Sequence, residues 1–342
     1  MQFSLIIPSR NRAKTLSRTL ERTLAATLGD PRTEVIVVDN NSTDNTKQVV
    51  EGHQHRSAGL RYLHQEQPGL LAARHAGWKA AGGEILLFLD DDVFICDTII
   101  DAYQDVFSSQ DVWLAGGNNW PLFEGEIPSW LEEEWNRSID GKQALPELSI
   151  LKFPHKAPIE HDPFFVWGCN FAIRRTALQA AGGFHPDGYP GPLLKFRGDG
   201  ETHVASFVKD NGGRTIFHPN ASVHHLVSSD RMTVDYMRNR AFSNGITSSY
   251  TKLRKKYAGK PALYPFVDKF RYSVAQLFSF ERDSERDDSG EPTEPSINCF
   301  RDFIRHHESR GKLFHKTAFY REAKVMEWTL RSNYLGGEAP SA

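Results

Sequence analysis

Two hydrophobic periods alternate over the first hundred residues of the chain. Continuous apolar runs, typical of strands buried on both faces, occur in "FSLIIP", "EVIVVD" and "EILLFLD", with a weaker run in "LRYLHQ". Between them lie stretches of helical period, such as the stripe of Leu16, Leu20 and Leu24, and a second helix is expected to begin at Ser42 or Thr43. The alternation predicts an α/β fold with a parallel sheet and right-handed crossovers.

Less regular segments follow this part of the chain. Residues 118–165 are rich in Trp, Pro and acidic residues and have no clear period, which is typical of a long functional loop. Two short strands are predicted in "RTIFHP" and "ASVHHL", and the chain beyond residue 227 is predominantly helical, apart from a disordered loop near 281–296. We therefore predict a catalytic domain over 1–227 and a mainly helical C-terminal extension over 228–342.

Polar residues follow three predicted strands at the ends where parallel sheets bind ligands. These groups are Ser9-Arg10-Asn11, Asp39-Asn40-Asn41 and Asp90-Asp91-Asp92. Because the carboxyl ends of parallel strands share one edge of a sheet, we expect the three groups to converge. Adjacent aspartates repel one another unless a cation or raised pKa values neutralise them. Asp90 and Asp92, as alternate residues, predict a site for Mg²⁺ or Mn²⁺, and the alternative is an acidic turn that caps the next helix.

Four other polar residues have a functional and a structural interpretation each. Asp39 can hydrogen-bond a base or ribose, or it can cap the following helix. Arg74 can contact a phosphate, or it can face solvent. Asp199 and Glu201, in "GDGETH", can supply a general base, or they can merely favour the dipole of a helix start.

Composition and motifs disfavour several classes of protein. The 342 residues include 41 Lys and Arg against 43 Asp and Glu, which argues against binding to nucleic acid. The sequence contains no G-x-G-x-x-G, no G-x-x-x-x-G-K-[ST] and no G-x-S-x-G nucleophile elbow, which disfavours dinucleotide oxidoreductases and P-loop NTPases. Three distant cysteines without zinc spacing, together with the lack of a signal peptide or a membrane span, predict a cytoplasmic protein.

Six groups of motifs occur in a specific order over roughly residues 2–227. They are "SLIIPSRNR", "EVIVVDNNSTDNT", "GLLAARHAG", "ILLFLDDDV", "GCNFAIRR" with "GGF", and "GDGETHVASFVKDNGG" with "VHH". This ordered set resembles the family 2 glycosyltransferases. The resemblance implies the GT-A fold, a Rossmann-like α/β/α sandwich found in nucleotide-diphospho-sugar transferases. It also implies inverting, metal-dependent transfer from a nucleotide-diphosphate sugar to an acceptor hydroxyl, in polysaccharide or glycoconjugate biosynthesis.

The resemblance also assigns roles to individual residues. The residues that it places at the nucleotide are Pro8, Ser9, Asn11, Asp39, Arg74, Asp90 and Asp91. Asp92 and Asp90 match the D-x-D signature and would hold Mn²⁺ or Mg²⁺ together with His225, although strand alternation also allows a buried structural histidine there. The catalytic base of the family usually lies in a Glu-Asp pair before a helix. Here Glu201 replaces that aspartate and Asp199 offers a second carboxylate, so both stay candidates.

Other interpretations and surface features stay open at this point. A nucleotidyltransferase also combines an α/β sheet with acidic metal ligands, and a sugar-nucleotide binding protein needs no catalytic base. The acceptor is expected to be a carbohydrate or a lipid-linked molecule, selected by the loop at 118–165. The basic segment 252–260 can contact the inner face of the cell membrane, or it is a solvated helix face. The apolar face around residues 300–328 can form an oligomer contact.

Overall fold

The structure, a computed structural model, describes residues 2–55, 57, 59–189, 191–261, 264–270, 272, 300–335 and 340. Its strands are β1 (Phe3–Ser9), β2 (Thr33–Asp39), β3 (Leu60–His64), β4 (Ile85–Leu89), β5 (Val93–Ile95), β6 (Val112–Gly116), β7 (Asn119–Phe123), β8 (Gln143–Leu145), β9 (Ile150–Lys152), β10 (Ile159–Glu160), β11 (Asn170–Arg174), β12 (Arg214–Phe217) and β13 (Val223–Val227). Its helices are α1 (Ala13–Thr27), α2 (Thr46–Gln54), α3 (Leu70–Ala80), α4 (Ile99–Val106), α5 (Ser129–Asn136), α6 (Arg175–Ala180), α7 (Glu201–Asp210), α8 (Val234–Tyr257), α10 (Phe300–Arg321) and α11 (Ala323–Leu330). This order confirms the predicted α/β class.

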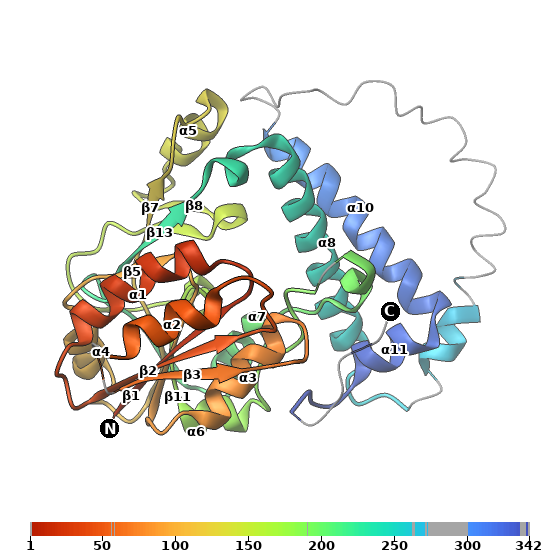
Figure 1. The fold of residues 1–342 in the computed structure, drawn as a ribbon. Helices are drawn as coiled ribbons and strands as arrows, with labels where there is room; N and C mark the ends of the chain where they lie inside the picture. Colours follow the sequence, from red (N-terminus) through yellow and green to blue (C-terminus); the bar gives the residue numbers. More distant parts are fainter. Residues whose placement is uncertain are drawn as a thin grey trace.

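The larger sheet has eight strands in the order β10-β12-β6-β11-β4-β1-β2-β3 (Figure 1). The strands β4, β1, β2 and β3 pair in parallel, as the apolar runs predicted. β11 instead pairs antiparallel with both β4 and β6. The parallel pairing predicted from the first hundred residues is thus present, and β11, from later in the chain, adds an antiparallel strand next to it. An antiparallel strand needs no crossover helix before it, so the helical pattern in the sequence does not indicate the position of β11.

Two hydrophobic layers cover the opposite faces of this sheet. Alternate residues of β1 point to opposite sides: Phe3 and Leu5 pack in the layer that includes α1, α2 and α4, whereas Ile6 packs in the layer that includes α3, α6 and α7. The predicted stripe on α1 is buried in the first of these layers. A strand buried on both faces has to be apolar at every position, which explains the continuous runs in the sequence.

The second helix begins at Thr46 rather than at Ser42 or Thr43. The cause is Asp44, whose carboxylate accepts hydrogen bonds from the backbone N–H of Thr46 at 3.0 Å and of Ala13 at 3.0 Å. One side chain therefore anchors the starts of α1 and α2. The prediction placed the helix start at the first residues able to cap it, but the tertiary contact with Ala13 favours Asp44.

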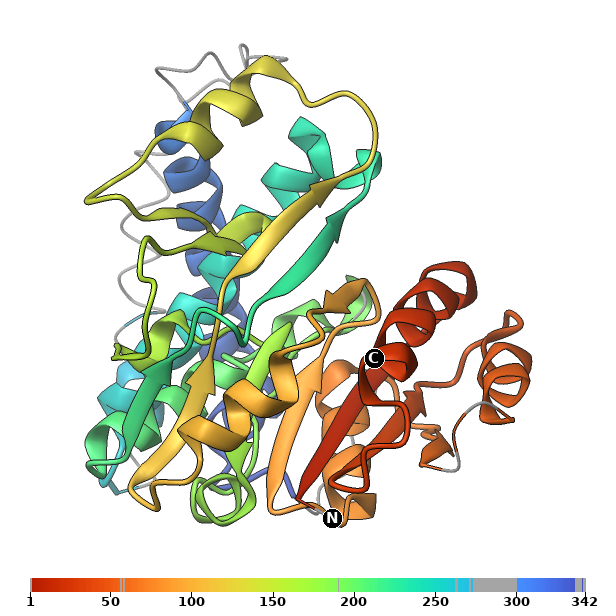
Figure 2. The same cartoon turned by 90° about the vertical axis from the view of Figure 1, so that its left-hand side faces the viewer.

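The segment 118–165 contains regular structure and is not one long loop. Its strands β7, β8 and β9 join β5 and β13 in a second sheet of order β5-β13-β7-β9-β8. Figure 2 shows the yellow β7 and the green β13 side by side, leading up to α5. Within this segment, β8 and β9 have three residues each, and β10, which belongs to the larger sheet, has two. Strands this short show no recognisable alternation of apolar and polar residues, so the sequence does not reveal them.

The C-terminal helices pack closely against each other and against the first part of the chain. At the crossing of α8 and α10, a Cβ on Gly245 would collide with the carbonyl oxygen of Glu308, and one on Gly311 would collide with that of Phe242. One hydrophobic core joins residues of α8, α10 and α11 to residues of the larger sheet. The domain boundary after residue 227 stays a prediction, and the loop near 281–296 lies outside the described residues. Among the described helices, none is both long and apolar enough to cross a membrane.

Candidate functional site

The polar groups that follow β1, β2 and β4 lie at one edge of the larger sheet. β1 is the central strand of the three, and Ser9 is the register partner of Asp39 on β2. Ser9 also donates a hydrogen bond from its Oγ to Oδ2 of Asp91 at 2.6 Å, which joins the ends of β1 and β4. The expected convergence at the carboxyl ends is therefore present in the structure.

Asp90, Asp92 and His225 form a compact cluster in which the potential ligand atoms all lie within 4.8 Å of one another. His225 comes from β13, which pairs with β5 so that His225 lies opposite Val93. Its Nε2 is 3.1 Å from Oδ1 of Asp92. Burial raises the pKa of Asp90. Burial also opposes the charged form of Asp92, but the contact with His225 and the nearby guanidinium groups outweigh it and hold the pKa of Asp92 below its usual range.

Two arginines that the sequence did not indicate supply positive charge to this cluster. Arg12 donates to Asp91 Oδ1 at 2.7 Å and to Asp92 Oδ2 at 2.9 Å. Arg231 Nη1 lies 3.2 Å from both Asp92 Oδ2 and His225 Nε2. The cluster thus attracts cationic groups, and carboxylate and imidazole ligands suit Mn²⁺, so these residues fit a divalent cation. Arg12 occurs in the "SRNR" motif, but no local pattern singles out Arg231.

Glu201 opens α7 and belongs to the same site. Arg74, which is buried, donates from Nη1 to Glu201 Oε2 at 3.2 Å, and its Nη2 lies 3.8 Å from Asp90 Oδ1. The backbone N–H of Gly168 donates to Glu201 Oε1 at 3.1 Å. Both oxygens of this carboxylate are therefore oriented, while the side chain keeps about a quarter of its surface exposed (26%).

Two adjoining cavities give access to these side chains. The first, of about 590 Å³, is lined among others by Arg12, Arg74, Asp90, Asp92, Glu201 and Arg231. The second, of about 280 Å³, is lined among others by Pro8, Ser9, Asn40, Asp90 and Asp91. Arg12 and Asp90 line both cavities, so the two spaces are neighbours. Most of the residues predicted at a nucleotide and a metal therefore surround one continuous region.

Two of the predicted nucleotide-binding residues do not line these cavities. The Asp39 carboxylate is buried, accepting the backbone N–H of Ser42 at 2.9 Å and the hydroxyl of Tyr62 at 2.8 Å. The Asn11 side chain accepts the backbone N–H of Thr43 at 2.7 Å. Both side chains hold the loop after β2 in place. Their predicted contact with a nucleotide stays a prediction.

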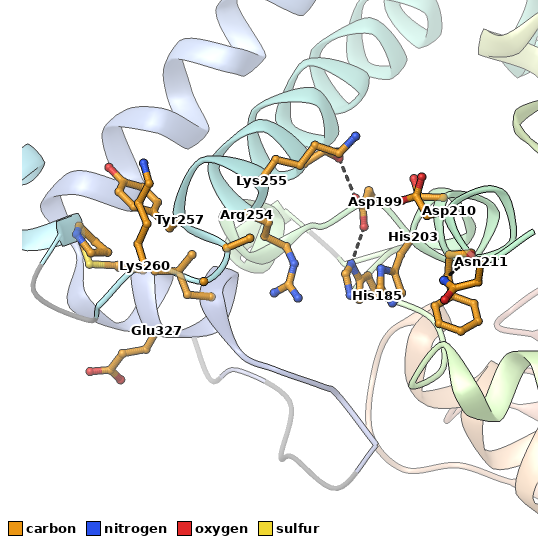
Figure 3. Close-up of a pocket in the computed structure, with 18 of the residues that line it drawn as sticks. His185, Asp199, His203, Asp210, Asn211, Arg254, Lys255, Tyr257, Lys260 and Glu327 are labelled. Atoms are coloured by element: carbon orange, nitrogen blue, oxygen red, sulfur yellow. Dashed lines mark hydrogen bonds and ion pairs between the residues drawn. The ribbon is translucent and has the colours of Figure 1, made fainter.

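Asp199 lies on a different side of the loop that leads into α7. Figure 3 shows it in another cavity, where it accepts hydrogen bonds from His185 Nδ1 at 2.7 Å and from Thr251 Oγ1 at 2.7 Å. Burial opposes its charge, but the hydrogen bond from His185 outweighs this and lowers the pKa of Asp199. Burial lowers the pKa of His185 to about 4, so a neutral imidazole donates this bond near pH 7. The structure therefore does not bring Asp199 and Glu201 together.

The fold and the site define a class of protein: a GT-A-like α/β fold with an acidic cluster at the end of a central strand. The sequence model of the family "Glycosyl transferase family 2" matches residues 4–182, and the chain belongs to this family. The predicted family and fold class are thus confirmed.

Individual relatives match shorter parts of the chain. Glycosyltransferase AglE of Haloferax volcanii is 34% identical over 116 residues, which cover 34% of this chain and 38% of AglE. The validoxylamine A glucosyltransferase of Streptomyces hygroscopicus subsp. jinggangensis is 38% identical over 92 residues, or 26% of this chain and 22% of that enzyme. The first three curated relatives are matched over 38%, 34% and 51% of their own length.

A solved structure with a similar fold is the mannosyltransferase PcManGT from Pyrobaculum calidifontis in complex with GDP-Man and Mn²⁺. The match has a TM-score of 0.50 and 16% sequence identity, and it covers 94% of this chain and 75% of that chain. At this level of identity the likeness shows the fold alone.

Proposed function

We propose that this protein transfers a sugar from a nucleoside-diphosphate sugar to a hydroxyl of an acceptor, with inversion at the anomeric carbon and with Glu201 as the general base. One observation carries the proposal: an oriented, partly exposed carboxylate lies in the same cavity as a cluster of cation ligands. The family of the chain and the sugar-transferase names of its relatives support it.

The proposed reaction is a single displacement. Glu201 accepts the proton of the acceptor hydroxyl, and that oxygen forms a bond to the anomeric carbon. The bond from this carbon to the diphosphate breaks on the opposite face, and its electron pair goes to the leaving nucleoside diphosphate. Arg74 and the backbone N–H of Gly168 orient Glu201, so its proton-accepting oxygen is positioned before the acceptor binds.

The leaving diphosphate gains negative charge in this reaction, and the site is built to receive it. Asp90, Asp92 and His225 would hold Mn²⁺ or Mg²⁺, which neutralises that charge when bound. Arg12 and Arg231 add guanidinium groups that can donate hydrogen bonds to phosphate oxygens. Pro8, Ser9 and Asp91 surround the adjoining cavity, which we assign to the nucleoside. The presence of two adjoining cavities supports this division of the site into phosphate and nucleoside regions.

The acceptor is proposed to be a carbohydrate or a lipid-linked molecule used in polysaccharide or glycoconjugate synthesis. The cavity at Glu201 is bordered by Glu124 and Ser149, which come from the segment 118–165. This position supports the prediction that the segment selects the acceptor. One relative, the poly(ribitol-phosphate) beta-N-acetylglucosaminyltransferase TarS of Staphylococcus aureus, is named for a polymeric acceptor and is 34% identical over 104 residues. A cytoplasmic location of the protein stays a prediction.

A thermal-shift panel of nucleotide sugars, with and without Mn²⁺, tests the proposal directly. A donor present at about 100 times its Kd stabilises the folded state by about 2.7 kcal/mol, and we expect this shift for one donor and only with metal. Incubation with acceptors should then release a nucleoside diphosphate. Release of pyrophosphate would instead indicate a nucleotidyltransferase, and donor binding without turnover would indicate a sugar-nucleotide binding protein.

A further inference from the structure

Large apolar side chains are exposed on a short helix at residues 264–270. Tyr264, Phe266, Val267 and Phe270 have exposed fractions of 53%, 52%, 44% and 72%, whereas Pro265 of the same helix is buried. At 100° per residue, the four exposed side chains fall within an arc of about 160°. The helix therefore presents an apolar face to solvent, which is the reverse of the usual arrangement in a soluble domain.

Three lysines at the end of α8 and in the turn after it precede this apolar face, and Lys260 lies 5.8 Å from the centre of the Tyr264 ring. Lys252, Lys255 and Lys260 are exposed, and within the described part of the chain none of them lies within ion-pair distance of a carboxylate. Lys256 is paired with Asp268 at 2.7 Å, and this aspartate is the only acidic residue in the sequence from 252 to 270. The segment therefore combines an excess of positive charge with exposed aromatic rings.

Some of these residues border a cavity of about 670 Å³ between α7, the end of α8 and α11 (Figure 3). Lys255, Lys260 and Phe266 line it, and its apolar walls include Met326 and Leu330. Figure 1 places this region, with the cyan helix beside α11, at the outer edge of the C-terminal helices. An apolar group that reaches past the lysines thus has space to enter the protein.

We propose that this basic-aromatic surface, formed by Lys252, Lys255, Lys260, Tyr264, Phe266, Val267 and Phe270, docks on an anionic membrane. The lysines contact anionic headgroups, and the aromatic side chains enter the interface between headgroups and acyl chains. Charge complementarity selects an anionic occupant over a neutral apolar protein surface. The four exposed apolar side chains and the cavity with apolar walls beside them favour a membrane over an acidic protein surface, which offers no acyl interior for them to enter. Docking here does not depend on the sugar-transfer reaction, because the surface includes no residue of the catalytic cavity.

Vesicle flotation of the full-length protein tests the proposal. Phosphatidylcholine vesicles with and without phosphatidylglycerol are compared at low salt and in high salt. We expect the protein to float with the anionic vesicles only, and less at high salt. Each lysine near an anionic surface contributes about a fivefold gain in partitioning, so the variant Lys252→Gln/Lys255→Gln should bind about 25-fold more weakly.

Matched variants separate this surface from a general effect of charge. Lys14→Gln/Lys156→Gln removes two exposed lysines elsewhere and should leave flotation unchanged. Phe270→Ser should weaken flotation at both salt concentrations. Because Phe270 is 72% exposed, the variant should fold like the wild type, and a thermal melt checks this. Equal binding to neutral vesicles, no binding to either kind, or equal loss in both lysine variants would overturn the proposal. So would a dimer in sedimentation that Phe270→Ser dissociates, because the surface would then be occupied by a second copy.

Discussion

Glu201 and Asp199 are two residues apart in the sequence, and replacing each by its amide separates their roles. Glu201→Gln keeps the shape of the side chain but removes its ability to accept a proton. Its single amide oxygen can accept from Arg74 or from the N–H of Gly168, and because about a quarter of the side chain is exposed (26%), water can accept from the other donor. General-base catalysis contributes about 10²–10⁴ in rate, so kcat should fall by this factor, which corresponds to about 2.7–5.5 kcal/mol in the activation free energy. Donor affinity and the melting temperature should stay close to those of the wild type.

Asp199→Asn should act mainly on stability. The Asp199 carboxylate accepts from both His185 and Thr251. An asparagine can still accept from His185 and can donate to the hydroxyl of Thr251, whose proton keeps the carbonyl oxygen of Thr247 as an acceptor. Both hydrogen bonds then lose their charged partner, and because each is worth about 1 kcal/mol more when one partner is charged, the free energy of unfolding should fall by about 1–3 kcal/mol. Because Asp199 acts on Glu201 only through the backbone of the loop, kcat should fall less than in Glu201→Gln, and the shape of the pH–rate profile should be retained.

Three measurements on the same preparations decide between these roles. Steady-state kinetics gives kcat and KM, calorimetric titration gives donor affinity, and urea denaturation gives the free energy of unfolding. The reasoning is refuted if Asp199→Asn abolishes turnover at undiminished stability while Glu201→Gln retains it. Such a result would mean that Asp199, and not Glu201, faces the acceptor. Asp199 would then have to leave its hydrogen bonds with His185 and Thr251.

Three further predictions concern the cation cluster, a buried histidine and the helix crossing. Asp92→Asn should abolish the metal-dependent thermal shift and lower kcat by at least 100-fold, and chelation with EDTA should do the same in the wild type. Full activity in either experiment would contradict the role of Asp90, Asp92 and His225 as metal ligands. Burial lowers the pKa of His315 to about 4, below the unfolded value of about 6.5, so its contribution to stability is complete above pH 6.5 and declines toward pH 4. When the pH is lowered from 7 to 5, the free energy of unfolding should fall by about 2 kcal/mol less in His315→Phe than in the wild type. An equal fall in both proteins would argue against a lowered pKa of His315. Gly311→Ala should lower the free energy of unfolding in urea by about 3 kcal/mol because its methyl group meets backbone, whereas Gly52→Ala in α2, with open space around it, should raise it by up to about 1 kcal/mol.

The sequence predicted those strands that can be identified from their own residues alone. β1, β2 and β4 are buried on both faces, so their apolar runs identify them, and parallel pairing then places Ser9, Asp39 and Asp90 at one edge. β11 is buried at every position as well, but its direction in the sheet depends on the path of the segment that precedes it. No local pattern contains that information, so the antiparallel insertion could not be foreseen.

The candidate site shows the same limit at the level of side chains. The aspartates after β4 could be identified from the sequence because three adjacent like charges repel one another. His225 was assigned to the metal by the family resemblance. Arg231 follows a short turn after β13 and reaches Asp92 only through the tertiary fold. Glu201 and Asp199 carry similar chemistry at almost the same position in the sequence. In the structure, Gly200 between them has a positive φ, and the two side chains line different cavities.

The close crossing of α8 and α10 has a practical consequence for recombinant work. Thr247 and Thr251 of α8 hold the carbonyl oxygen of Gly198 and the side chain of Asp199, just before the proposed base. Truncation of the chain after α8 would remove α10, the helix against which Gly245 of α8 packs. A truncated product that ends near residue 260 would therefore not be a minimal enzyme, and expression boundaries should extend at least through α11.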